Sequence, residues 1–265
     1  MSKTISIFVS STFSDMQSER DYLNRIIMPR LEEVFIDQHI HLRLVDLRWG
    51  IDLHQANETE RENLVLKVCL DEINNCKPFF IGLLGERYGW VPSEEKISEA
   101  LAGEDFSYES ENKSVTALEM EYVILHKNEH LARSRFYFRK PEVYKKIPEN
   151  IRAAYCDIDN PQLTKEEKKL RSEKLKSLKT GILQHYNRAD DMSRIRLYDS
   201  RWENNSISGL EEWGEMVFLD LKEDIQHYVS AEKGNIPETI YEIEKNRIDV
   251  FTERRISNFR GRKRL

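Results

Sequence analysis

The sequence predicts an α/β fold in which a five-stranded parallel sheet carries helices on both faces. Five short apolar segments alternate with segments of helical periodicity, and parallel strands need such crossover connections. Residues Phe79–Leu84 are almost wholly apolar, as expected of a strand buried on both faces. At 265 residues, the chain is long enough for a sizeable core and for about one or two domains.

The expected strands are short and rich in β-branched and aromatic residues. They cover residues 5–9, 41–47, 79–84, 135–138 and 194–198. Between them, apolar residues recur three or four positions apart, as in amphipathic helices. These helices are expected at about residues 14–35, 58–75, 115–128, 165–187 and 209–231.

Single residues predict several details of these helices. Pro29 lacks an N–H group and its ring clashes with the preceding turn, so it should kink or split the first helix. Ser14 or Asp15 is expected to cap that helix. Ser114 or Thr116 is expected to cap the third helix. The last helix should bury one apolar face, formed by Trp213, Val217, Leu221 and Ile225.

Charge and turn residues predict the domain organisation. Residues 139–192 are highly charged and contain three prolines, so we expect an excursion that ends in a Lys-rich helix. A Gly-Asn-Ile-Pro break at 234–237 separates a domain of residues 1–232 from a linker helix at 233–265. The last twelve residues hold six Lys and Arg and no acid, which suits a solvated tail or a nucleic-acid arm.

Composition narrows the function classes. The formal net charge of −6 argues against a general nucleic-acid binder. No apolar run is long enough to span a bilayer, and no signal peptide precedes the first strand, so a cytoplasmic protein is expected. The three cysteines lack metal-binding spacing, and His126 and His130 lack a clustered third ligand. We therefore expect no metal site and no membrane association.

Ligands of parallel sheets bind beyond the carboxyl ends of the strands. Ser10, Ser11 and Thr12 end the first strand, where hydroxyls and exposed N–H groups suit a phosphate or a ribose. The alternative is that these residues only cap the following helix. Asp46 and Arg48 end the second strand, where the guanidinium could pair with a phosphate.

Aromatic residues accompany these polar groups. Trp49 follows Arg48 and could stack on a base, although an Asp–Arg pair with a packing Trp is an equal alternative. Arg87, Tyr88 and Trp90 follow the third strand in a segment with two glycines, which permit sharp turns. Their loop is either a ligand loop or a structural turn whose rings cover the sheet.

Thr116 and Glu119 lie in the first turns of the third helix, beyond the same strand ends. A carboxylate there could hold a ribose and stabilise an oxocarbenium-like centre during glycosidic cleavage. The alternative is that Glu119 interacts favourably with the helix dipole.

Five segments in order resemble one known family. They include the signature at 7–23, Val-Asp-Leu-Arg-Trp-Gly at 45–50, Cys-Leu-Asp-Glu-Ile at 69–73, Gly-Leu-Leu-Gly-Glu-Arg-Tyr-Gly-Trp-Val-Pro at 82–92 and Ser-Val-Thr-Ala-Leu-Glu at 114–119. The chain resembles the TIR-like domain at the N-terminus of STAND NTPases, such as telomerase-associated protein, the nephrocystin type and bacterial STAND proteins.

The resemblance implies a flavodoxin-related, TIR-like fold and a role in innate immunity or antiphage defence. Many TIR domains self-associate and cleave NAD at the nicotinamide–ribose bond with a glutamate, and Glu119 occupies the comparable position. NAD or a related nucleotide would be the substrate, with no further cofactor. This sequence has Thr-Ala-Leu-Glu at 116–119 where ordinary TIR domains have Trp-Cys-x-x-Glu. A non-catalytic interaction and self-association module is the alternative.

The basic tail has a counterpart in the same family. Its string at 259–265 resembles the Phe-x-Gly-Arg-x-x-Leu segment that introduces a NACHT or related ATPase domain. The resemblance implies that a C-terminal STAND ATPase is the partner of this domain in a longer protein.

Overall fold

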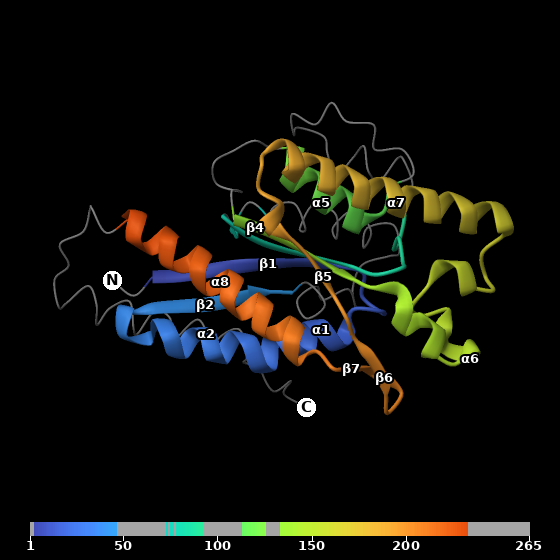
Figure 1. Ribbon diagram of the computed structural model, residues 1–265. Helices are drawn as coiled ribbons and strands as arrows, with labels where there is room; N and C mark the ends of the chain where they lie inside the picture. The colour runs from blue at the N-terminus through green and yellow to red at the C-terminus, as the bar shows by residue number, and fades with distance from the viewer. Residues whose placement is uncertain are drawn as a thin grey trace, which may run out of the picture.

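A computed structural model describes residues 3–46, 73, 75–76, 78–92, 113–125 and 133–232. Within these ranges, five parallel strands form one sheet in the order β2-β1-β3-β4-β5 (Figure 1). The strands are β1 (Lys3–Ser11), β2 (Ile40–Val45), β3 (Phe79–Leu84), β4 (Arg133–Arg139) and β5 (Ile195–Tyr198). The predicted α/β fold with a five-stranded parallel sheet is therefore confirmed.

The order in which parallel strands are added to the sheet changes direction at β1. From β1 it passes first to β2 on one side and later to β3 on the other, where Ser10 of β1 pairs with Gly82 of β3. This strand order is the doubly wound, flavodoxin-like one, in which ligands bind beyond the carboxyl ends of β1 and β3. The fold thus points to the edge formed by Ser10, Ser11 and the loop after Leu84.

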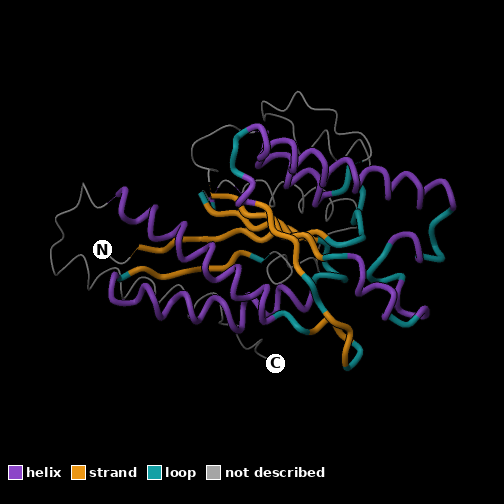
Figure 2. The backbone as a smooth tube through the Cα atoms, in the orientation of Figure 1, coloured by secondary structure: helices purple, strands orange, loops and turns teal. Residues whose placement is uncertain are grey.

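Helices cover both faces of the sheet (Figures 1 and 2). One face carries α1 (Gln17–Tyr22), α2 (Met28–Phe35) and α8 (Glu211–Glu232), and the other carries α5 (Val115–Leu125) and α7 (Lys165–Arg188). Side chains of a strand alternate between faces, so Ile7 joins the core under α8 and Phe8 joins the core under α5. The predicted apolar face of α8 is confirmed, because Trp213, Val217, Leu221 and Ile225 are all fully buried.

Pro29 splits the first helix, as predicted. The chain forms α1, then a π-helical turn at Leu23–Ile27, and then α2 with Pro29 in its first turn. Proline is tolerated there because the first N–H groups of a helix have no intrahelical partner. The predicted cap of α1 is wrong. Met16 precedes α1 and makes no side-chain cap hydrogen bond, and the Asp15 carboxylate instead accepts a hydrogen bond from Thr12. The cap of α5 is confirmed for Ser114, whose Oγ accepts a hydrogen bond from the Ala117 N–H at 3.2 Å.

The charged excursion is largely ordered into short elements. They are the 3₁₀ segments Pro141–Lys146, Asp157–Asp159 and Met192–Arg194, together with α6 (Glu149–Arg152) and α7. Thr164 and Glu167 form a capping box at the start of α7, which explains why the predicted Lys-rich helix begins there. A further 3₁₀ turn, Ile36–Gln38, precedes β2.

A small hairpin after β5 was not predicted. Its strands are β6 (Arg201–Glu203) and β7 (Ser206–Ser208), and Asn204 and Asn205 between them have φ angles of 50° and 61°. Such left-handed Asn pairs suit two-residue hairpin turns. Three-residue strands are too short to show a period of two in the sequence.

Some sequence predictions fall outside the described residues. They concern the helix at 58–75, most of the loop at 91–114, His126, His130 and the linker helix at 233–265. No helix in the described ranges is long and apolar enough to cross a membrane.

Candidate functional site

Ser10 and Glu119 meet at the carboxyl edge of β1 and β3. The Ser10 hydroxyl donates a hydrogen bond of 2.5 Å to Oε2 of Glu119, and the two side chains come from positions 109 residues apart. Both residues are buried, with 1% and 6% of their surface exposed. Ser10 faces α5 because it shares the strand face of Phe8, two positions earlier. A carboxylate therefore lies where this fold binds ligands.

Ser11 points to the opposite face and contacts α1. Arg20 donates through Nε to Ser11 Oγ at 2.6 Å and through Nη2 to the Ser11 carbonyl at 3.0 Å. Nη1 of Arg20 forms a buried ion pair with Asp46. The predicted candidates Ser11 and Asp46 thus both contact Arg20, a buried arginine that the sequence analysis did not single out. Arg48 and Trp49 lie outside the described residues.

Thr12 and Asp15 begin a buried ionic network behind the edge. Thr12 donates from Oγ1 to Asp15, and Arg139 donates to the Asp15 carbonyl at 2.8 Å and to Glu19 Oε1 at 2.7 Å. Tyr198 also donates to Glu19 Oε1, at 3.0 Å. Burial raises the pKa of the Asp15 carboxyl to about 6, although the Arg139 charge opposes the rise. This network fixes the chain that follows β1.

The loop after β3 closes over the end of β1. Gly89 has a φ of 95°, and a Cβ built on it would lie 2.9 Å from Thr12 Cγ2 and 3.5 Å from Thr116 Oγ1. Only glycine suits both this backbone and this close approach. Ser10, Thr12, Thr116 and Glu119 therefore belong to one region, formed by β1, the Gly89 loop and the start of α5.

Arg87 and Tyr88 are held by the charged excursion. Arg87 donates to the Ala154 carbonyl at 3.1 Å, and its Nε lies 3.7 Å from Asp157 Oδ1. The Tyr88 N–H donates to Asp157 Oδ2 at 2.7 Å, and burial raises the pKa of the Tyr88 phenol to about 12. These contacts favour the structural alternative for Arg87 and Tyr88.

Two aromatic side chains remain exposed beside this region. Trp90 is 42% exposed on the loop after β3, and Phe13 is 54% exposed on the loop after β1. Thr12 and Gly89, their neighbours in the chain, approach each other closely. Trp90 thus keeps the exposure that a stacking role requires.

Three residues that shape the edge were missed in the sequence. Arg20, Arg139 and Asp157 are each buried and each fix one of its segments. No local sequence pattern marks them, and each has a partner far away in the chain. Among the described residues, no group of three His, Cys, Asp or Glu side chains could hold a metal ion.

Comparison with known proteins identifies a family. The family described as "Domain of unknown function (DUF4062)" matches residues 6–197. Mouse telomerase protein component 1 is 30% identical over 234 residues, which cover 84% of this chain and 8% of that protein. A TPR repeat-containing protein of Dictyostelium discoideum is 32% identical over 186 residues, or 66% of this chain and 11% of its own length.

A shorter match links the chain to NACHT proteins. Human NACHT and WD repeat domain-containing protein 2 is 29% identical over 105 residues, covering 37% of this chain and 6% of that protein. The chain thus spans about a tenth or less of the length of these three relatives. No solved structure matches the chain.

Proposed function

Because the chain belongs to the DUF4062 family, we propose that it is the TIR-like effector domain of a NACHT-type STAND protein and cleaves NAD when assembled. Relatives named for NACHT domains and for telomerase protein component 1 support the coarser part of this proposal. The finer part, NAD cleavage, is carried by the buried Ser10–Glu119 pair at the carboxyl edge.

Burial of the Glu119 carboxylate is unfavourable in free energy unless its contacts or its function compensate. Only 6% of its surface is exposed, and removing a carboxylate from water is unfavourable unless its interactions offset the loss. Buried carboxylates in ligand-binding positions are frequent functional groups. The Ser10 hydroxyl can orient Glu119 through its hydrogen bond.

The proposed reaction breaks the bond between the nicotinamide nitrogen and C1′ of the ribose. The bonding electron pair leaves with neutral nicotinamide, and positive charge develops on the ribosyl ring. The Glu119 carboxylate would stabilise this charge and then accept a proton from the water that attacks C1′. The products are nicotinamide, ADP-ribose and a proton, so atoms and charge balance.

Assembly is part of the proposal. STAND proteins would bring several copies of this domain together through their ATPase neighbour, and paired copies could complete a shared site. The exposed Trp90 and Phe13 are available to a nucleotide base or to a second copy.

The direct test incubates an artificially oligomerised form of the chain with NAD and measures released nicotinamide by chromatography. The proposal expects release by the oligomer, much less by the monomer, and none above background by an oligomer carrying Glu119→Gln. An oligomer that releases no nicotinamide would overturn the catalytic proposal.

A second candidate is a non-catalytic module that signals by self-association. Phe13 and Trp90 favour this candidate, because large apolar side chains exposed beside the edge suit a contact with a second copy. Sedimentation of the isolated domain would then show self-association that Glu119→Gln leaves unchanged, without NAD turnover; a strictly monomeric domain at all concentrations would contradict this candidate.

A further inference from the structure

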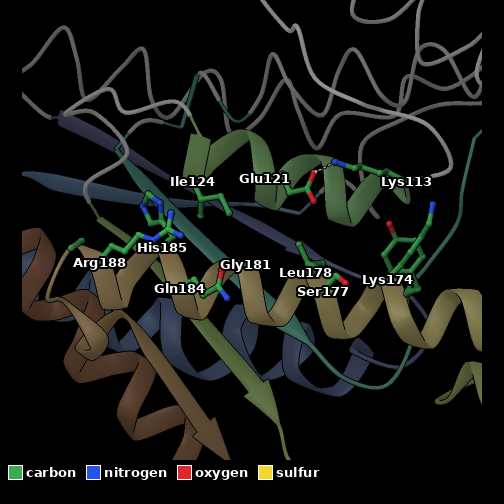
Figure 3. A pocket seen from close by; sticks show the side chains of 12 residues that line it. Lys113, Glu121, Ile124, Lys174, Ser177, Leu178, Gly181, Gln184, His185 and Arg188 are labelled. Atoms are coloured by element: carbon green, nitrogen blue, oxygen red, sulfur yellow. Dashed lines mark hydrogen bonds and ion pairs between the residues drawn. The ribbon is translucent and has the colours of Figure 1, made fainter.

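A cavity of about 680 Å³ lies between α5 and α7 (Figure 3). These two helices lie on the face of the sheet away from α8 (Figure 1). Residues Ser177, Leu178, Gly181 and Gln184 of α7 form one wall, and Ile124 of α5 lies on the other. Small-molecule sites typically occupy about 300–1,000 Å³, so this cavity is of suitable size.

The charged side chains around the cavity are mainly basic. Lys113 and Lys174 lie toward one end, and His185 and Arg188 lie toward the other (Figure 3). Glu121 is the one acid among the described residues of the lining, and it forms a 2.7 Å ion pair with Lys113. On a chain with a net charge of −6, such a basic lining favours an anionic ligand.

Arg188 stands out among these basic residues. Its guanidinium has no hydrogen bond or ion pair within the described part of the chain, whereas Arg171 and Arg194 on either side each have acidic partners. A position in the last turn of α7 already favours a cation through the helix dipole. Its five donors remain available to a phosphate, which guanidinium groups bind in a bidentate manner.

Gly181 lines the cavity without a side chain that would project into it. It lies in the interior of the 24-residue helix α7, where glycine is unfavourable compared with alanine. A Cβ built on Gly181 would meet no atom within 4 Å, whereas one on Gly82 would lie 2.6 Å from the ring of Phe136. Packing therefore does not require glycine at 181, and the missing side chain leaves this part of the cavity wall open.

We propose that this cavity binds a small organic anion with a phosphate group and a flat apolar body, that is, a nucleoside phosphate. Arg188 binds the phosphate, while Leu178 and Ile124 contact the apolar body. Ser177 and Gln184 offer hydrogen bonds to the base edge. Inorganic phosphate alone would leave most of the volume to water.

The site is separate from the Ser10–Glu119 edge. Residues two apart on a helix differ by about 200° around its axis, so Glu119 faces the sheet edge while Glu121 faces the cavity. The inference therefore does not rest on the proposed NAD cleavage.

The test titrates the full chain with ADP by isothermal titration calorimetry and compares adenosine and inorganic phosphate. ADP should bind, and adenosine and inorganic phosphate should each bind with much lower affinity. Arg188→Gln removes a charge-assisted contact and should weaken ADP by about tenfold or more. Lys169→Gln also removes one positive charge from α7, at an exposed position outside the cavity, and should leave ADP affinity unchanged.

Gly181→Trp should strongly weaken ADP binding by placing an indole ring in the cavity, and Gly181→Ala, which adds one methyl group, should retain it. Circular dichroism confirms that each variant folds, and Glu119→Gln should bind ADP like the wild type. The inference is overturned if ADP does not bind at millimolar concentration, or if folded Gly181→Trp binds it normally. Binding of a hexaglutamate peptide without binding of ADP would also overturn it.

Discussion

Ser10 and Ser11 are adjacent in the sequence but serve different parts of the molecule. Strand alternation places Ser10 against Glu119 on the α5 face and Ser11 against Arg20 on the α1 face. From the sequence, both were grouped with Thr12 as one ligand loop. Only Ser10 and Thr12 reach the region around Glu119, which makes the two serines a matched pair for mutation.

Ser10→Ala should lower NAD cleavage and destabilise the domain by about 1–3 kcal/mol, because it removes a hydrogen bond from a buried carboxylate. Ser11→Ala should leave cleavage unchanged, because Arg20 retains the Ser11 carbonyl and Asp46. Nicotinamide release and urea unfolding measure both effects. Equal loss of cleavage in the two variants would contradict the separate roles.

Asp15 should make stability fall as pH rises. Its folded-state pKa of about 6 lies above the usual value for aspartate, so the folded state binds the proton more tightly. The resulting stabilisation is complete below about pH 4 and is lost as pH rises through about 6. Urea unfolding should show the wild type losing roughly 3 kcal/mol relative to Asp15→Asn between pH 4 and 7. A difference that stays constant or grows with pH would refute this assignment.

At the scale of elements, Arg139 connects β4 to the start of α1. Its fully buried guanidinium contacts Asp15, Glu19 and Tyr144. Arg139→Met would leave two carboxylates buried without that cation, which should cost about 3–5 kcal/mol in the free energy of unfolding.

Lys140→Ala is the matched control for Arg139→Met. Lys140 pairs with Asp199 at the surface, where solvent screens ion pairs and they contribute little to stability. Chemical denaturation of both variants measures the difference. Similar small losses in both would show that the buried network does not hold α1 to the sheet.

Elements with a strong local signal were predictable, and contacts between elements were not. Both the apolar run of β3 and the apolar face of α8 were predicted closely. The first is an unbroken apolar segment, and the second repeats every four residues, so each pattern is visible within one element. The burial of Arg20 against Asp46 depends on how α1 meets β2, which no local pattern contains. The order of strands and helices placed Glu119 at the strand edge. Its hydrogen bond to Ser10 joins residues 109 positions apart, so no local pattern could predict it.

In the molecule as a whole, the helix α8 marks the expected end of the folded domain. The Gly-Asn-Ile-Pro break at 234–237 interrupts the helical pattern where a linker would. Truncation after Glu232 should therefore leave a folded domain whose Tm changes by less than about 4 °C, equivalent to about 1 kcal/mol for this size. Calorimetry of both forms tests this, and a large loss of stability would place residues 233–265 in the core.

Glycosidic cleavage by Glu119 at the β1–β3 edge is the step on which the proposed function depends. The most direct measurement is the rate of nicotinamide release from NAD by oligomerised wild type, Glu119→Gln and Glu121→Gln under identical conditions. We predict that Glu119→Gln lowers the rate by at least about 100-fold, since it removes the charge facing the developing cation. Glu121→Gln, a change on the opposite side of α5, should retain the wild-type rate. Full activity of Glu119→Gln, or loss of activity only in Glu121→Gln, would contradict this role of Glu119.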